Sequence, residues 1–243
     1  MPGPVWLLLP TYNESENIAA IVEAVLRALE QAAPDDHRVL IVDDSSPDGT
    51  GAIADGLATE HAAVEVLHRS EREGLGPAYL AGFAHALAAG AGYVCQMDAD
   101  FSHDPADVPR LLAAVRDGAD LALGSRYVAG GGVADWGMLR RIVSRAGCYY
   151  ARVVLGLAVR DLTGGFKCFR REVLEAIELP TVRSHGYCFQ IEMTQRALLR
   201  GFEVREVPIT FHDRRHGHSK MSPWIALEAI VVLPQLRWRS KFH

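Results

Sequence analysis

The stretch that decides the fold is "YVCQMDADFSHDP", residues 93–105, in which an apolar run ends in two aspartates. Residues 93–97 predict a short buried strand, and Asp98 and Asp100 follow it directly. The segment beyond, through Val108 and Leu112, has the apolar spacing of an α-helix. A strand that leads into carboxylates and then into a helix is typical of the carboxyl edge of a parallel sheet, where such folds bind ligands.

The same alternation of strand and helix runs through the first half of the chain. Further strands are predicted at residues 5–9, 38–42, 63–68 and 120–124. Between the first two, apolar residues from Ile18 to Leu29 form one helix face, and Asn13 and Glu16 are spaced as a capping box that could open it. A last strand is predicted within residues 203–211. We therefore expect a single α/β domain over residues 1–243, with a mostly parallel twisted sheet flanked by helices.

Composition limits the possible partners. The 243 residues are 49% hydrophobic and carry a formal net charge of -5, which disfavours a duplex nucleic acid as partner. Four widely spaced cysteines without a C-x-x-C pair indicate a reducing, cytoplasmic protein without a zinc knuckle. The apolar N-terminus has no basic region before it, so no signal peptide is expected. The apolar stretch "WIALEAIVVLPQL", residues 224–236, is too short for a spanning helix and contains Glu228 and Pro234, so no transmembrane segment is expected.

Asp98 and Asp100 suit a divalent ion that bridges substrate phosphates. Mg²⁺ and Mn²⁺ prefer oxygen ligands and often take only one or two protein carboxylates, with phosphate and water completing the shell. An isolated D-x-D is more often a helix cap or part of a solvated loop. The metal interpretation therefore depends on whether the loops after the other strands agree with it.

Those loops do agree, and six blocks make the sequence recognisable. They are "LLPTYNESENI" (8–18), "IVDDSSPDGT" (41–50), "MDAD" (97–100), "GSRY" (124–127), "DLTGGFKCFRREVL" (161–174) and "DRRHGHSKM" (213–221). In order and spacing they resemble the inverting glycosyltransferases with a nucleotide-diphospho-sugar transferase (A type) fold, and within them the dolichol-phosphate (polyprenol-phosphate) mannose synthases. The resemblance covers nearly the whole chain.

The resemblance implies an activity. The chain would transfer mannose from GDP-mannose to a polyprenyl (dolichyl) phosphate with inversion, using Mg²⁺ or Mn²⁺. Nothing in the spacing separates guanine from uracil, so a UDP-hexose polyprenyl-phosphate glycosyltransferase remains an alternative. A catalytically silent sugar-nucleotide-binding subunit is another, although such a protein has less need of a metal and phosphate-binding cations.

The resemblance also implies which residues form the site. It places around the sugar nucleotide Pro10, Tyr12, Glu14, Val42, Asp44, Asp98, Ala99, Asp100, Arg126, Arg214 and Lys220. The implied metal ligands are Asp98, Asp100 and Ser102, and the implied catalytic residues are Asp98, Asp100 and Arg126. Arginine and lysine in these positions would hold phosphates of the donor, the acceptor or both. No general base is expected, because a phosphate acceptor is already anionic at neutral pH.

Two other patterns are set aside. "GLGPAY", residues 74–79, imitates a dinucleotide fingerprint, but Tyr79 replaces its third glycine and the stretch begins several residues after its strand, which disfavours a dehydrogenase. His212, His216 and His218 lie beside a glycine in an expected loop, and a zinc site usually needs a fixed scaffold and four ligands.

A membrane surface is the remaining expected partner. In residues 138–157, apolar residues follow helical spacing while four arginines occupy another face, as an interfacial helix requires. A helix packed on the core with a wet basic face explains the pattern equally well. Residues 222–243 form a second candidate interface helix. We expect peripheral attachment at the cytoplasmic face of a membrane, directly or through a separate anchor protein.

Overall fold

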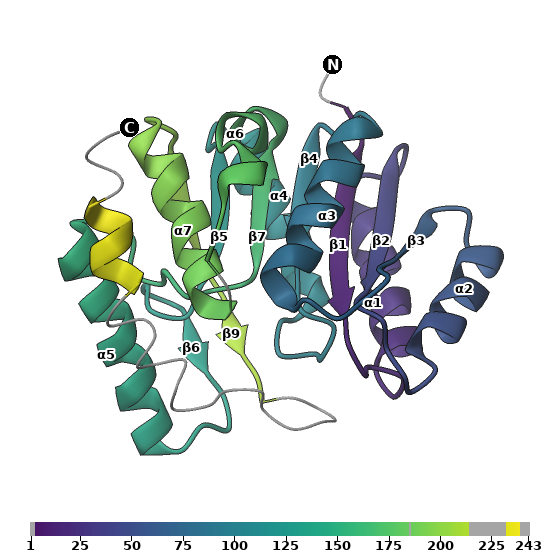
Figure 1. Cartoon of the computed structure of the whole chain (residues 1–243), viewed down its shortest axis with the longest axis horizontal. Coiled ribbons are helices and arrows are strands. Elements are labelled where there is room, and N and C mark those ends of the chain that lie inside the picture. Colours follow the sequence, from purple (N-terminus) through teal and green to yellow (C-terminus); the bar gives the residue numbers. More distant parts are fainter. Residues whose placement is uncertain (1–2, 185, 214–231, 239–243) are drawn as a thin grey trace.

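A seven-stranded, mostly parallel sheet forms the centre of the computed structural model, which describes residues 3–184, 186–213 and 232–238 (Figure 1). In spatial order its strands are β3 (Val64–His68), β2 (His37–Asp43), β1 (Val5–Thr11), β4 (Tyr93–Gln96), β7 (Lys167–Arg170), β5 (Leu121–Ser125) and β8 (Val204–Pro208). Two short strands, β6 (Gly132–Val133) and β9 (Thr210–Phe211), pair separately. The predicted α/β fold class is confirmed.

The register of the sheet brings the functional loops to one edge. β1 pairs in parallel with both β2 and β4, and Thr11 at the end of β1 lies opposite Asp43 at the end of β2. The segments that follow these three strands therefore leave the sheet side by side. β7 is antiparallel to both of its neighbours, β4 and β5. It is the one strand of this sheet that the apolar pattern did not predict.

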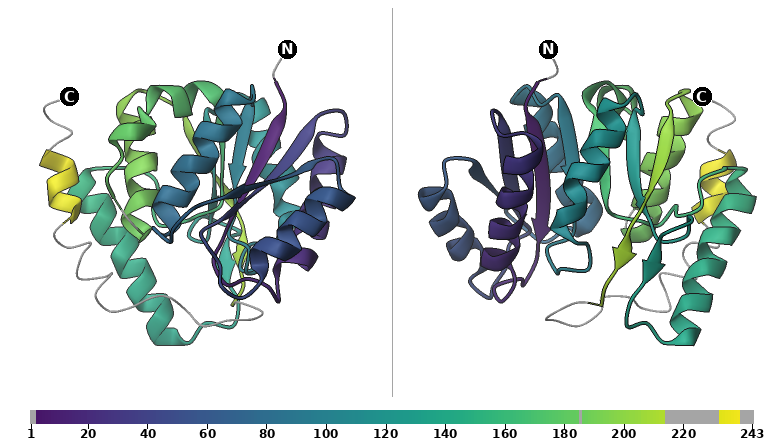
Figure 2. Two further views of the ribbon diagram at one scale, coloured as in Figure 1. Left: turned by 45° about the vertical axis from the view of Figure 1, so that its right-hand side comes forward. Right: turned by 180° about the vertical axis from the view of Figure 1, so that it is seen from behind.

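Helices cover both faces of the sheet, as a buried parallel sheet requires. The helices are α1 (Ile18–Ala32), α2 (Thr50–Glu60), α3 (Leu75–Ala88), α4 (Val108–Arg116), α5 (Met138–Leu155), α6 (Arg171–Ala176) and α7 (Gly186–Leu199), with 3₁₀ turns at Pro105–Asp107 and Leu179–Thr181. α1, α2 and α4 pack on one face, and α3, α6 and α7 pack on the other (Figure 2). Each face has its own hydrophobic cluster.

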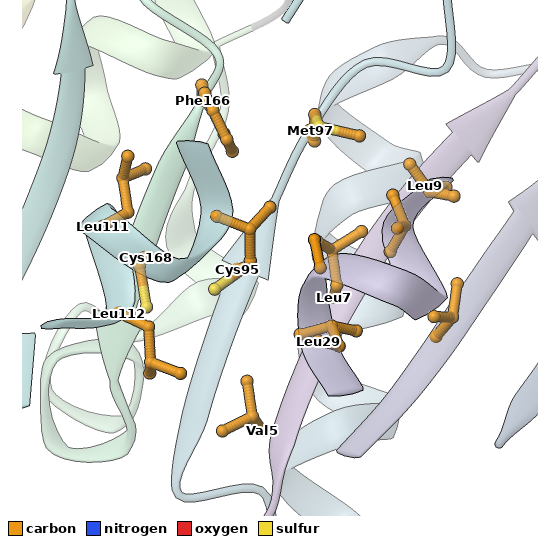
Figure 3. Packing of buried hydrophobic residues seen from close by; sticks show 14 of the residues in the cluster. Val5, Leu7, Leu9, Leu29, Cys95, Met97, Leu111, Leu112, Phe166 and Cys168 are labelled. Atoms are coloured by element: carbon orange, nitrogen blue, oxygen red, sulfur yellow. The ribbon is translucent and has the colours of Figure 1, made fainter. Parts of the chain in front are cut away.

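Alternation along β1 shows how the two clusters are separated. Val5, Leu7 and Leu9 point to the side of α1 and α4, where they meet Leu29 and the sulfur-bearing side chains of β4 and β7 (Figure 3). Trp6 and Leu8 point to the side of α3. Every residue of β1 is buried, which explains why its sequence is an apolar run without polar alternation.

α5 lies at the end of the molecule opposite α2, beside a short helix at residues 232–238 (Figure 1). Leu233 and Leu236 of that helix are buried in a third cluster with Ala151 and Leu155 of α5. Residues 222–231 and 239–243 of the second candidate interface helix lie outside the described residues. Among the described residues, no helix combines the length and the apolar composition needed to span a bilayer.

The predicted capping box before α1 is wrong. The helix begins at Ile18 after Asn17, and Asn13 adopts a left-handed backbone conformation with φ of 55°. Residues 13–15 instead donate their backbone N–H groups to side chains of the loop after β2 and of the first residue of α2: Asn13 to Ser46, Ser15 to Asp48, and Glu14 to Thr50. These tertiary hydrogen bonds tie the loops after β1 and β2 together.

Candidate active site

A cleft with a volume of about 270 Å³ opens at the carboxyl ends of β1, β2 and β4. Of the predicted site residues, it is lined by Pro10, Tyr12, Glu14, Asp44, Asp98, Ala99 and Asp100. The structure therefore brings together the residues from three separate sequence blocks. Val42, Ser102 and Arg126 are not among the residues that line the cleft, and Arg214 and Lys220 lie outside the described residues.

The wall formed by the loop after β1 is held rigidly. Asp48 accepts hydrogen bonds from the side chain of Thr50 at 2.6 Å and from the backbone of Ser15 at 3.1 Å. Burial acts to raise the pKa of Asp48, but these hydrogen bonds outweigh it and lower the pKa to about 2. The guanidinium of Arg72 lies 3.9 Å from the ring centroid of Tyr12, a cation–π contact at the mouth of the cleft.

Asp44 organises a second wall. Its carboxylate is almost fully buried, accepts a hydrogen bond from Gly74 N at 2.7 Å, and also binds Arg69. These contacts hold residues 69–74, which lead into α3, against the loop after β2. Val42, two residues earlier on β2, points into the core against α3. Of these two predicted residues, only Asp44 faces the cleft.

The two aspartates after β4 form the floor of the cleft. Asp98 is half-buried and accepts a hydrogen bond from the Tyr79 hydroxyl at 3.2 Å. Asp100 is 4% exposed, and its Oδ1 accepts the backbone N–H of Ser102 at 3.0 Å. Burial, followed by the Asp98 charge, keeps the pKa of the Tyr79 phenol well above its usual value, so this hydroxyl remains a donor at neutral pH.

These residues fit a divalent cation. The hydroxyl Oγ of Ser102 is buried beside Asp100 and has no hydrogen-bond partner among the described residues. A bound cation would give this oxygen a partner and would balance the two carboxylates. Within the described residues, His, Cys, Asp and Glu side chains nowhere gather in groups of three or more suited to a metal. The side chains of Asp98, Asp100 and Ser102 offer only oxygen atoms, the ligands that Mg²⁺ and Mn²⁺ prefer, and these ions often bind one or two protein carboxylates together with substrate and water.

Arg126 is buried in an ion pair that the sequence did not reveal. Its Nε and Nη2 donate to the two carboxylate oxygens of Asp161, each at 2.7 Å, and Nη2 also donates to Thr163 at 2.8 Å. Both residues of the pair are at most 7% exposed, and Asp161 keeps the pKa of Arg126 raised despite the opposing effect of burial. Thr163 lines the cleft, so Arg126 supports the wall of the cleft from behind.

A second cavity, of about 410 Å³, lies between α5 and the segment after β5. It is lined by Tyr127, Arg145, Cys148, Tyr149, Arg152 and Arg160. Three arginines around one hollow make a site for an anion. The guanidinium of Arg126 lies 5.2 Å from the Tyr127 ring, so Arg126 contacts residues of both cavities. The helical spacing in the sequence already placed Arg145 and Arg152 on one helix face. Arg160 lies outside that helix, and only the folded structure brings it to the same cavity.

Comparison with known proteins adds three relationships. The model of a family described as glycosyl transferase family 2 matches residues 6–178. The polyprenol monophosphomannose synthase of Mycolicibacterium smegmatis is 52% identical over 97% of this chain and 87% of that protein. The undecaprenyl-phosphate mannosyltransferase of Micrococcus luteus is 47% identical over 96% of this chain and 93% of that protein.

Solved structures show the same fold. The glucosyl-3-phosphoglycerate synthase of Mycobacterium tuberculosis, crystallised with Mn²⁺, UDP-glucose and phosphoglyceric acid, superposes with a TM-score of 0.69. The superposition covers 97% of this chain and 80% of that one, at 20% sequence identity. At that identity the likeness is evidence for the fold alone.

Proposed function

Because the chain belongs to glycosyl transferase family 2, we propose that it transfers mannose from GDP-mannose to a polyprenyl phosphate with inversion of the anomeric carbon. The observation that carries this proposal is the meeting of Asp98 and Asp100 with Tyr12 and Glu14 around one cleft. It is supported by two relatives, at 52% and 47% identity over nearly the whole chain, whose names both describe mannose transfer to a polyprenyl phosphate.

The nucleoside would lie at the end of the cleft formed by Pro10, Tyr12 and Glu14. Tyr12 offers an aromatic face and Glu14 a carboxylate that can accept hydrogen bonds from a base or a ribose. Asp44 mainly stabilises the wall of the cleft, because Arg69 and the backbone N–H of Gly74 already bind its carboxylate oxygens.

The diphosphate would lie above Asp98 and Asp100 with Mg²⁺ or Mn²⁺, for which Asp98, Asp100 and Ser102 are the ligands we propose. The cation would supply stabilisation of the negative charge that develops on the leaving nucleoside diphosphate. Tyr79 fixes Asp98 and the Ser102 backbone fixes Asp100. The carboxylates are thus oriented before the ligand arrives, which is how such sites stabilise developing charge.

The basic cavity beside α5 supports an anionic acceptor. We place the polyprenyl phosphate head group among Arg145, Arg152 and Arg160, with Arg126 between this cavity and the cleft. The arginines would offset the repulsion between two anionic substrates. A phosphate oxygen needs no base to remove a proton, so we assign no residue that role. Arg214 and Lys220, also proposed for phosphate binding, lie outside the described residues.

The lipid part of the acceptor requires a membrane surface, and α5 offers a face for it. Leu139 and Ile142 are 75% and 58% exposed, and Val143, Tyr149 and Val153 are exposed as well. Arginines of the same helix lie beside them, a pattern typical of helices that rest in the headgroup region. We propose that α5 binds the cytoplasmic face of the membrane peripherally. A separate anchor protein would have the same effect.

The donor can be identified by ligand-induced thermal stabilisation. GDP-mannose and GDP with Mn²⁺ should raise the melting temperature of the protein in a dose-dependent manner, because a ligand that binds only the folded state stabilises it. If UDP and UDP-glucose stabilise the protein and the guanine nucleotides do not, the donor is a UDP-hexose and not GDP-mannose. A protein that responds to no nucleotide, with or without metal, would contradict the proposed function.

A further inference from the structure

A buried amide in the cleft has a donor that nothing in the described residues uses. Gln190, on α7, is 2% exposed and lines the cleft. Its Nε2 has no hydrogen-bond partner among the described residues. Buried amide donors are nearly always paired in folded proteins, so an unpaired one that faces a ligand cleft indicates a ligand atom.

The orientation of this amide is fixed by two neighbours. The Oε1 of Gln190 accepts from Gln96 Nε2 at 2.7 Å and from Lys167 Nζ at 2.9 Å. Lys167 also donates to the main-chain carbonyl of Gln190 at 2.7 Å. A flipped amide would set the Nε2 donor against these two donors, so Nε2 must occupy its present side. All three side chains are at most 2% exposed, which leaves them little freedom to rearrange.

Gly165 shows what Nε2 faces. A Cβ atom at this position would lie 3.6 Å from Gln190 Nε2 and 3.6 Å from each carboxylate oxygen of Asp98. The amide donor and the carboxylate acceptor therefore border the same small space, which a glycine leaves open. A hydroxyl group can accept from an amide and donate to a carboxylate at once. A polyhydroxylated ligand is the chemical class that this space suits.

The space also has the right position along the cleft. It borders Asp98, where we place the diphosphate. Thr163, two residues before Gly165, lines the same cleft and binds Arg126 beside the acceptor cavity. The group transferred must lie between the diphosphate and the acceptor. In the proposed reaction that group is the hexose.

We propose that Gln190 donates from Nε2 to a hydroxyl of the hexose on the donor nucleotide, and that Lys167 and Gln96 are positioning residues that hold it there. This inference rests on the proposed function. It makes Gln190 a residue that distinguishes a sugar nucleotide from the bare nucleoside diphosphate. The Lys167 amine serves in either protonation state, because a neutral amine still has two N–H groups for its two acceptors.

The test compares the affinities of GDP-mannose and GDP by calorimetry in Mn²⁺. Gln190→Met, nearly the same size but without a donor, should weaken GDP-mannose binding about tenfold while GDP binding stays within about twofold. Lys167→Met should likewise weaken the binding of GDP-mannose more than the binding of GDP. Gln195→Met is the matched control, because Gln195 is equally buried on α7 but does not line the cleft. It should leave both affinities unchanged.

A second variant fills the space itself. Gly165→Ala adds a methyl group at ordinary contact distance from Asp98 and Gln190, so the fold should tolerate it. It should lower GDP-mannose affinity at least tenfold and spare GDP. If Gln190→Met does not fold, the affinities of Gly165→Ala for GDP-mannose and GDP still test the inference.

The outcomes separate this inference from the proposed function. If the wild type binds GDP-mannose, and Gln190→Met or Gly165→Ala binds it equally well or loses GDP in parallel, the inference is wrong and the proposed function stands. If the wild type prefers UDP-glucose, the affinities of UDP-glucose and UDP are compared in place of those of GDP-mannose and GDP. If the wild type binds no sugar nucleotide, the proposed function fails and this inference fails with it.

Discussion

The hydroxyl of Tyr79 donates a hydrogen bond to Oδ1 of Asp98 across 3.2 Å, which links α3 to the floor of the cleft. The Tyr79 ring is parallel to that of Phe189, with an interplanar angle of 2° and centroids 6.0 Å apart. Phe189 precedes Gln190 on α7. One aromatic pair therefore fixes two cleft residues, Asp98 directly and Gln190 through its helix.

Tyr79→Phe tests this link. The ring contacts remain, so the loss of stability should be about 1 kcal/mol, while Asp98 loses the donor that orients it. We expect metal-dependent binding of the nucleotide to weaken about fivefold. Titration with Mn²⁺ at fixed GDP measures this. Tyr93→Phe on β4, outside the cleft, is the control. Equal metal dependence in both variants would show that Tyr79 has no orienting role.

The sequence predicted the first five strands because they are short apolar runs; β1, β4 and β5 are buried along their whole length, and β3 is only partly buried at the edge of the sheet. It also predicted the family, which the comparisons confirm. β7 was missed because its four residues follow a Gly-rich loop and include the buried Lys167. Asp161 was missed because its partner Arg126 is 35 residues away and only the fold brings them together. Local pattern carries no information about such pairs.

The buried pair of Arg126 and Asp161 should be important for stability. Asp161→Ala leaves a buried guanidinium without a counter-charge, so we expect the free energy of unfolding to fall by about 3–5 kcal/mol. Urea unfolding measures this. The double variant Arg126→Met with Asp161→Leu should lose less than the single one. Arg27→Ala, in an exposed pair with Glu23, should cost at most about 1 kcal/mol. A loss that small for Asp161→Ala would contradict the structure.

The exposed face of α5 should bind anionic vesicles. Leu139→Glu with Ile142→Glu places charges in that face without disturbing the core, because both side chains are exposed. We expect the double variant to lose flotation with vesicles that contain phosphatidylglycerol, and wild-type binding to fall as salt rises. Ile53→Glu on α2, at the opposite end of the molecule, should float like the wild type. Equal flotation of all three proteins would remove α5 from membrane binding.

Lys167 should give the fold a specific pH dependence. Burial lowers its pKa from 10.5 to about 7, and Asp161 offsets only part of that effect. Between these values the unfolded chain binds more protons at this residue than the folded one, so the free energy of unfolding rises with pH by up to about 1.4 kcal/mol per unit. Below the lower value both states hold the proton and the contribution is constant.

The variant Lys167→Met removes this dependence. Between about pH 7.5 and about pH 9.5, the unfolding free energy of the wild type should gain about 2 kcal/mol relative to the variant. Urea unfolding of both proteins at the two pH values measures the difference, in which the other titrating groups cancel. A difference that is flat with pH would mean that Lys167 keeps an ordinary pKa.

The central claim is that a phosphate, and not a hydroxyl, attacks the donor. Labelled GDP-mannose is incubated with the protein and Mg²⁺ or Mn²⁺, and with either a polyprenyl phosphate or the free polyprenol of the same length. Asp100→Asn and excess chelator serve as inactive controls. We predict that label enters the organic phase with the polyprenyl phosphate alone, as an acid-labile mannosyl phosphodiester. Comparable transfer to the free alcohol would contradict the account.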